Sequence, residues 1–142
     1  MFNKHCLVFL GIILANVISL PTAKAEVAIV VNSANSSVLS DSDLARLFLG
    51  KLKSFPDGDK AEPINQKFGN DIRKEFEQKV LGKSASQVKA YWSKQVFSGK
   101  GQPPHEEASD KDILNKVAND KTAIGYVDST SVDGSVKVVK KF

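Results

Sequence analysis

Cysteine and histidine are scarce in this sequence, and their scarcity excludes several kinds of site. The 142 residues include one cysteine, Cys6, and two histidines. Cys6 precedes an apolar segment that we expect to be removed with it, so we expect neither disulfides nor metal–thiolate sites in the remaining chain. That remainder has one histidine, His105, in a Pro-Pro-His-Glu-Glu stretch typical of an exposed loop. A single loop histidine favours neither a metal centre nor a Ser-His-Asp arrangement, and we expect no metal or cofactor.

The first 25 residues have the pattern of a signal peptide. Lys4 supplies a positive charge, residues 6–20 are mostly apolar, Pro21 follows, and Ala-Lys-Ala at 23–25 provides the small residues that a signal peptidase recognises. A membrane anchor is the alternative, but the apolar segment is shorter than the roughly 20 residues that span a bilayer, and polar residues interrupt it. We therefore predict a signal peptide over residues 1–25, cut after Ala25, and a periplasmic or secreted protein with no membrane span after cleavage.

The remaining residues, 26–142, are enough for one domain, because most domains contain about 100–150 residues. Removing Lys4 and Lys24 from the 20 basic residues leaves 18, against 16 acidic residues. This charge is too small and too evenly spread to favour nucleic acid as a partner. The sequence has no G-x-S-x-G motif, and the Gly-Lys-Ser at 82–84 lacks the first glycine of a phosphate-binding loop, because Glu77 stands there. We therefore predict a binding protein and not an enzyme.

Apolar periodicity and turn residues predict an α/β domain. Short β-branched and apolar runs predict strands at residues 27–31, 63–65, 123–127 and 136–139. Caps and apolar spacing predict helices between Ser40 and Gly50, between Asn70 and Gly82, from Ser84 through Val96, and from Ser109 or Asp110 through Val117. This order of elements predicts a mixed sheet covered by helices.

Two features of the middle of the chain each allow two interpretations. The spacing of Tyr91 and Trp92 from Val88 and Val96 predicts that at least one of the aromatic rings lies in the core, and the alternative is a ring that stacks on a ligand. The Gly- and Pro-rich stretch at 98–104 is either a mobile lid or an ordinary helix-to-helix connection with a proline stop.

The order of several sequence blocks carries a family resemblance. The blocks are Leu-Ala-Arg-Leu-Phe-Leu-Gly-Lys at 44–51, Pro-Ile-Asn at 63–65, Gly-Asn at 69–70, Val-Leu-Gly at 80–82, Tyr-Trp at 91–92, Phe-Ser-Gly at 97–99 and Ala-Ile-Gly-Tyr-Val at 123–127. In this order they resemble the phosphate-type periplasmic substrate-binding proteins of ABC transporters, and more closely the short, single-lobe members of that superfamily. The resemblance implies one lobe of a class II binding-protein fold, without the second lobe that closes on the anion in full-length relatives.

A candidate anion site follows from the residues themselves. Residues 65–73 form a strand–loop–helix passage, and a helix start offers free N–H groups and a partial positive charge that suit an oxyanion. Gly69 permits close backbone approach, Asn70 can donate through its amide, and Arg73 in the first turn can add a charge-assisted bond, with Lys67 nearby. The alternative is that Asn70 only caps its helix and Arg73 is a solvated surface residue.

The resemblance transfers the family's ligand residues only in part. By position, the family's arginine falls on Gln66, its serine on Asn70, the following glycine on Asp71 and its threonine on Ile72. Backbone donors are kept, while two hydroxyl groups and one charge are lost. Asp71 can either accept a proton from a monohydrogen phosphate or repel the anion.

The resemblance therefore implies an exported protein that binds phosphate or a similar oxyanion weakly, as the substrate-binding component of a phosphate ABC transporter does. The alternative is a protein-interaction module of the cell envelope that uses a degenerate, ligand-free lobe to dock on an envelope or transporter partner. An apolar exposed surface would favour the module, and a polar pocket at Asn70 would count against it. A third hypothesis, a small hydrolase, needs a buried carboxylate with a perturbed pKa beside a serine hydroxyl.

Overall fold

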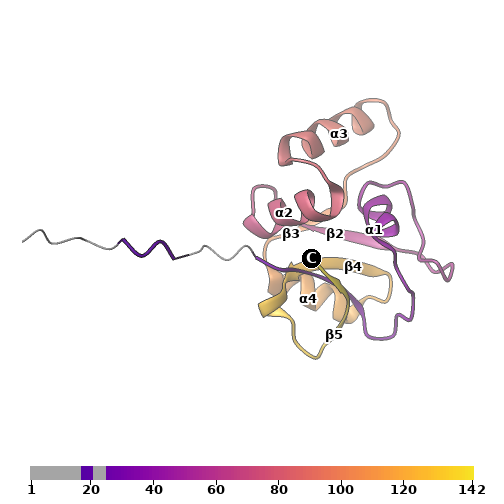
Figure 1. The fold of residues 1–142 in the computed structure, drawn as a ribbon. Helices are drawn as coiled ribbons and strands as arrows, with labels where there is room; N and C mark the ends of the chain where they lie inside the picture. Colours follow the sequence, from indigo (N-terminus) through magenta and orange to yellow (C-terminus); the bar gives the residue numbers. More distant parts are fainter. Residues whose placement is uncertain (1–16, 21–24) are drawn as a thin grey trace, which may run out of the picture.

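A five-stranded mixed sheet lies at the centre of the structure (Figure 1). The computed structural model describes residues 17–20 and 25–142; most of the predicted signal peptide, including Lys4, Cys6 and Ala23, lies outside the described residues. The strands run in the order β3-β2-β4-β1-β5, with bounds His105–Glu107, Glu62–Gln66, Ala123–Asp128, Val27–Asn32 and Val136–Lys141. β1 pairs antiparallel with β4 and β5, whereas β2 pairs parallel with β3 and β4. The predicted α/β class with a mixed, helix-covered sheet is confirmed.

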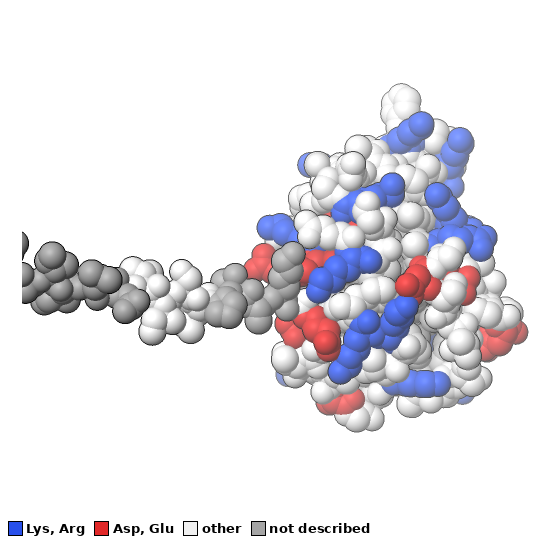
Figure 2. Space-filling view, viewed as in Figure 1, with Lys and Arg blue, Asp and Glu red and all other residues white. Residues whose placement is uncertain are grey.

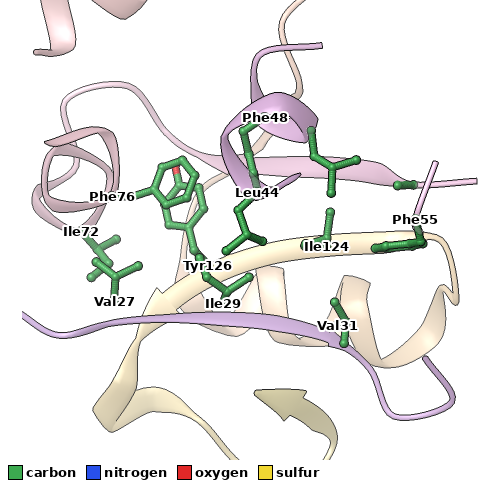
Figure 3. Packing of buried hydrophobic residues seen from close by; sticks show 12 residues of the cluster. Val27, Ile29, Val31, Leu44, Phe48, Phe55, Ile72, Phe76, Ile124 and Tyr126 are labelled. Atoms are coloured by element: carbon green, nitrogen blue, oxygen red, sulfur yellow. The ribbon is translucent and has the colours of Figure 1, made fainter. Parts of the chain in front are cut away.

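The central strand β1 is buried along its whole length, as its unbroken apolar run predicts. Val27, Ile29 and Val31 face one side, where they pack with residues of α1 (Asp41–Phe48) and α2 (Asp71–Phe76). Ala28 and Val30 face the other side and pack with residues of α4 (Asp110–Asn119). Because successive side chains of a strand alternate between faces, one apolar strand supplies both halves of the core. Figure 3 shows the larger half, in which the Phe76 and Tyr126 rings lie against each other.

The predicted helix starts are confirmed in their atomic detail. The Ser40 hydroxyl accepts from the Asp43 N–H, and the Asp43 carboxylate accepts from the Ser40 N–H, which closes a capping box ahead of α1. Ser84 and Gln87 make the same exchange ahead of α3 (Ala85–Phe97). Ser109, and not Asp110, caps α4 by accepting from the Asp112 N–H.

The structure adds three short elements that the sequence pattern does not predict. His105 lies on the short edge strand β3 and not in a loop, although its side chain is exposed as expected. α2 continues into a π-helical turn, Glu77–Leu81, which ends at Gly82 in the left-handed conformation. A 3-10 turn, Ser129–Ser131, follows β4. The stretch at 98–104 joins α3 to β3.

α3 lies farther from the sheet than the other helices (Figure 1). Only Val88 and Trp92 of this helix are buried. The Tyr91 hydroxyl donates to the Leu49 carbonyl at 2.6 Å, which fixes the middle of α3 to the segment after α1. Trp92 confirms the prediction that at least one of these two rings lies in the core. Within residues 17–20 and 25–142, no helix is both long enough and apolar enough to cross a membrane.

Gly125 lets α4 pack closely on the sheet. A Cβ atom at this position of β4 would stand 2.6 Å from the Cγ2 atom of Ile113, which is nearer than packed carbon atoms can approach. We predict that Gly125→Ala destabilises the fold by about 1–3 kcal/mol, because α4 must shift or Ile113 must change rotamer. Urea unfolding followed by circular dichroism measures this loss.

Gly134→Ala is the matched control, since a Cβ atom there meets nothing within 4 Å. Equal stability of the two variants would mean that α4 adjusts freely on β4, which contradicts the close packing described here.

Candidate functional site

The start of α2 is built as an exposed turn that leads from the centre of the sheet into a helix. The Asn70 N–H donates to the Lys67 carbonyl at 3.1 Å, and Gly69 has φ of +84°, a conformation that glycine adopts without strain. The Asn70 side chain accepts from the Ile72 N–H at 2.9 Å. The N–H groups of Asp71 and Arg73 have no acceptor among the described residues, as is usual for the first turn of a helix. Of these two residues Asp71 is exposed and Arg73 is buried, so the backbone donor at the surface is the Asp71 N–H.

Arg73 is buried, so the interpretation of this residue as a solvated surface arginine is wrong. Its side chain is 6% exposed, and it donates from Nε to Glu77 at 2.6 Å. From Nη1 it donates to Glu106 at 2.6 Å and to the Gln66 carbonyl at 2.9 Å. Burial opposes the charged form, but the bonds to Glu77 and Glu106 outweigh it and raise the pKa of Arg73. Two of its three guanidinium nitrogens are thus engaged by protein acceptors.

Gln66, in the position of the family's arginine, is directed into the domain. Its side chain is fully buried, and Nε2 donates to the Asp110 carboxylate at 2.6 Å and to the Tyr126 carbonyl at 3.1 Å. Its Oε1 atom is buried without a hydrogen-bond partner among the described residues. The amide therefore links β2 to β4 and α4, and its donor hydrogens point away from the exposed helix start.

Tyr126 connects the core to the strand that carries the site. Its ring stacks on Phe76 with centroids 3.8 Å apart. Its hydroxyl donates to the Asn65 side chain at 3.0 Å and accepts from the Gln66 N–H at 3.1 Å. Burial raises the pKa of this phenol well above its ordinary value, against the opposing effects of the Gln66 hydrogen bond and the Arg73 charge. The hydroxyl is therefore a neutral donor that fixes the end of β2.

Charge at the exposed helix start is mixed. The Asp71 side chain is fully exposed, and its carboxylate lies 3.8 Å from the Lys74 ammonium group. Lys67 is exposed in the preceding turn. An anion that reaches the Asp71 N–H would meet one carboxylate and two ammonium groups, all screened by water.

For the hydrolase hypothesis, three serine hydroxyls donate to carboxylates among the described residues, from Ser109 to Asp112, from Ser131 to Asp110 and from Ser135 to Asp133, and only the pair with Asp110 is part-buried. Asp110 accepts from the Ser131 hydroxyl at 2.7 Å, from the Gln66 amide and from the Asp128 N–H. These bonds join α4, β2 and the end of β4, and they engage both carboxylate oxygens. Among the described residues, no group of three or more His, Cys, Asp and Glu side chains is arranged to hold a metal ion.

The hollows in the surface of the described residues do not include the glycine turn itself, although one of them is lined by its neighbours Phe68 and Arg73. Three of them share Trp92 as a lining residue, and Gly69 and Asn70 line none of the three. The candidate site is therefore an exposed turn and not one of these hollows. Of the five predicted site residues, the structure places Gly69, Asn70 and Asp71 side by side in this turn. The side chains of Gln66 and Arg73 are bonded to other protein groups instead.

The chain has the fold of one lobe of the phosphate-type binding proteins. The features that define this class of fold are the mixed sheet, the helices that cover it and the exposed glycine turn after β2. The chain is similar to an ABC-type phosphate transport receptor from Vibrio cholerae, with a TM-score of 0.64 and 22% identity over 82% of this chain and 46% of the receptor. It is similar to a Clostridium perfringens protein, assigned as a phosphate ABC transporter substrate-binding protein and solved with bound phosphate, with a TM-score of 0.62 and 19% identity over 82% of this chain and 45% of that one.

A third similar structure is PstS from Borrelia burgdorferi, with a TM-score of 0.60 and 12% identity over 82% of this chain and 47% of that chain. This chain thus spans about half the length of the solved structures it matches. No family model and no curated protein matches the sequence. At sequence identities of 12–22%, the structural similarity is evidence for the fold alone.

The raised pKa of Tyr126 predicts a stability that falls in alkali. Because this pKa is higher in the folded state than in the unfolded state, the neutral phenol adds to the free energy of unfolding. This contribution is complete below the unfolded-state pKa of about 10 and is lost as the pH rises above that value. The chain has two tyrosines, so the Tyr91→Phe variant leaves Tyr126 as the only phenol. We predict that tyrosinate absorbance in this variant appears only together with the loss of circular dichroism. Ionisation of Tyr126 near pH 10 in a folded protein would show that its hydroxyl is open to water.

The buried ion pair predicts a difference between single and double replacements. Arg73→Met leaves Glu77 buried without its partner, and we predict a loss of about 3–5 kcal/mol in the free energy of unfolding. The double variant Arg73→Met/Glu77→Leu removes both charges, and we predict that it recovers most of that loss. Urea unfolding of both proteins measures the two values. If the double variant is as unstable as the single one, the bonds of Arg73 to Gln66 and Glu106, and not the pair with Glu77, account for its contribution.

Proposed function

We propose that this chain is an exported, single-lobe binding protein that takes a small oxyanion, with phosphate as the first candidate, at the turn from Gly69 to Asp71. One observation carries the proposal: the backbone N–H group of Asp71, an exposed residue at the start of α2, has no acceptor among the described residues. Such a donor and the positive end of a helix suit an anion. The fold likeness to phosphate-binding lobes supports the choice of phosphate, and export rests on the signal-peptide pattern.

Binding at this site is expected to be weak. One lobe on its own leaves an anion in contact with water and salt, where charge interactions are screened. The Asp71 carboxylate opposes the anion, and at about 5 Å in water two like charges repel by about 0.8 kcal/mol. The guanidinium of Arg73 is engaged by Glu77 and Glu106, so Arg73 does not contribute its charge to the anion. It supports the site by holding the turn in place through its bond to the Gln66 carbonyl. The anion is then held by the Asp71 backbone donor, with Asn70 and Lys67 beside it.

Two replacements at Asp71 separate the charge of this residue from its backbone donor. Asp71→Ala removes the carboxylate and keeps the N–H, so we predict that phosphate binds about fourfold more tightly than to the unchanged protein. Asp71→Pro removes both, and proline is tolerated at the first position of a helix. We predict that this variant loses the phosphate-dependent rise in unfolding temperature. Thermal unfolding against rising phosphate, with sulfate and chloride at matched ionic strength, measures both effects.

Asp59→Ala is the matched control, because Asp59 is exposed in the separate loop closed by the Ser54–Lys60 bridge and its side chain has no hydrogen bond among the described residues. Phosphate should stabilise this variant as it does the unchanged protein. If phosphate, sulfate and chloride all act alike on the unchanged protein, or if Asp71→Pro keeps the full response to phosphate, the proposed site is wrong.

A further inference from the structure

An apolar groove lies between the turn before α2 and the outer helix α3. Its volume is about 560 Å³, and its lining includes Phe68 from the turn, Arg73 from α2, Glu106 from β3, and Lys89, Trp92, Val96 and Phe97 from α3. We call it the α3 groove. It shares no lining residue with the Gly69–Asp71 turn, although Phe68 is the neighbour of Gly69 in the chain.

Large apolar side chains are exposed around the α3 groove. Phe97 is 95% exposed, Phe68 46% and Val96 43%. Leaving such side chains in water is unfavourable, since burying a phenylalanine side chain is worth about 1.5–3 kcal/mol. Apolar residues that gather beside a hollow mark an interaction surface more often than isolated exposed residues do.

Lysine side chains predominate on the α3 side of the groove, and the Glu106 carboxylate that lines it is paired with Arg73. The exposed Phe68 ring has the Arg73 guanidinium carbon 5.4 Å and the Lys89 ammonium nitrogen 5.6 Å from its centroid. Residues 78–105 contain five lysines and no aspartate or glutamate, so all 16 acidic residues of the chain lie outside this segment. Lys83, Lys89, Lys94 and Lys100 form no ion pair among the described residues. In Figure 2 the upper part of the molecule, where Figure 1 places α3, is mostly blue and white.

We propose that the α3 groove docks an acidic segment of a partner protein, which inserts an apolar side chain beside Trp92 and places carboxylates near Lys89. Charge complementarity favours this occupant, because Lys89 and Lys94 form no ion pair among the described residues and Glu106 is already paired with Arg73. A second copy bound through the same face would bring two such lysine groups together. A flat anionic membrane would meet the rim of the groove and leave its concave floor unfilled.

The test uses the purified, exported protein as bait for a displayed library of random peptides. Enriched peptides are expected to carry a large apolar residue flanked by aspartate or glutamate. The most enriched sequence, made as a free peptide, is expected to bind more weakly as salt rises. Phe97→Asp and Lys89→Glu are each expected to weaken it about tenfold or more, as replacements at the centre of an interface do.

Two replacements away from the α3 groove serve as controls. Val38→Asp places a charge on another exposed apolar residue, since Val38 is 87% exposed, and Lys121→Glu reverses another exposed lysine. Both are expected to bind the peptide as the unchanged protein does. Thermal unfolding confirms that all four variants are folded.

Three results would overturn the proposal. The first is the absence of enriched peptides, or enrichment of peptides without acidic residues. The second is Phe97-dependent binding to vesicles of equal parts phosphatidylglycerol and phosphatidylcholine without any enriched peptide, which would identify a membrane as the occupant. The third is self-association in analytical ultracentrifugation that Phe97→Asp abolishes, which would identify a second copy of the chain.

Discussion

The guanidinium group of Arg73 is the contact on which the geometry of the candidate site depends. It joins α2 to the carbonyl end of β2 through Gln66, to the π-helical turn through Glu77 and to the edge strand β3 through Glu106. A buried arginine is tolerated only when its charge is paired and its N–H groups are bonded, and these contacts satisfy both needs. Because the same group also lies over the Phe68 ring, one side chain fixes the turn before α2 and one wall of the α3 groove.

Because Arg73 has this structural role, its side chain is not available to bind an anion. A phosphate-type site usually relies on side-chain charge and hydroxyl groups, but here the amide of Gln66 faces Asp110 and the charge of Arg73 faces two carboxylates. A donor that stays open is the backbone N–H of Asp71, whose position is set by the strand–turn–helix path. A lobe can therefore keep the fold of an anion-binding protein while its polar side chains have been redirected to hold the domain together.

The sequence predicts the fold well because its signals are local. The apolar run of β1 and the capping boxes at Ser40 and Ser84 depend on neighbours within four residues, and the structure confirms them. The edge strand β3 is missed because its pairing partner, β2, lies some 40 residues away and its polar sequence carries no strand signal. Arg73 is misread for the same reason: the i, i+4 spacing to Glu77 is visible in the sequence, but the third partner, Glu106, comes from β3. Burial of a charge is thus decided by strand pairing that local patterns do not encode.

The two proposed sites are adjacent at Phe68. Phe68 forms one wall of the α3 groove, and Gly69, the next residue, begins the turn that presents the Asp71 backbone donor. A partner seated in the groove would cover part of that turn and exclude water from it, and charge interactions strengthen as the local dielectric constant falls. By linkage, any gain in anion affinity that the partner produces equals the gain in partner affinity that the anion produces.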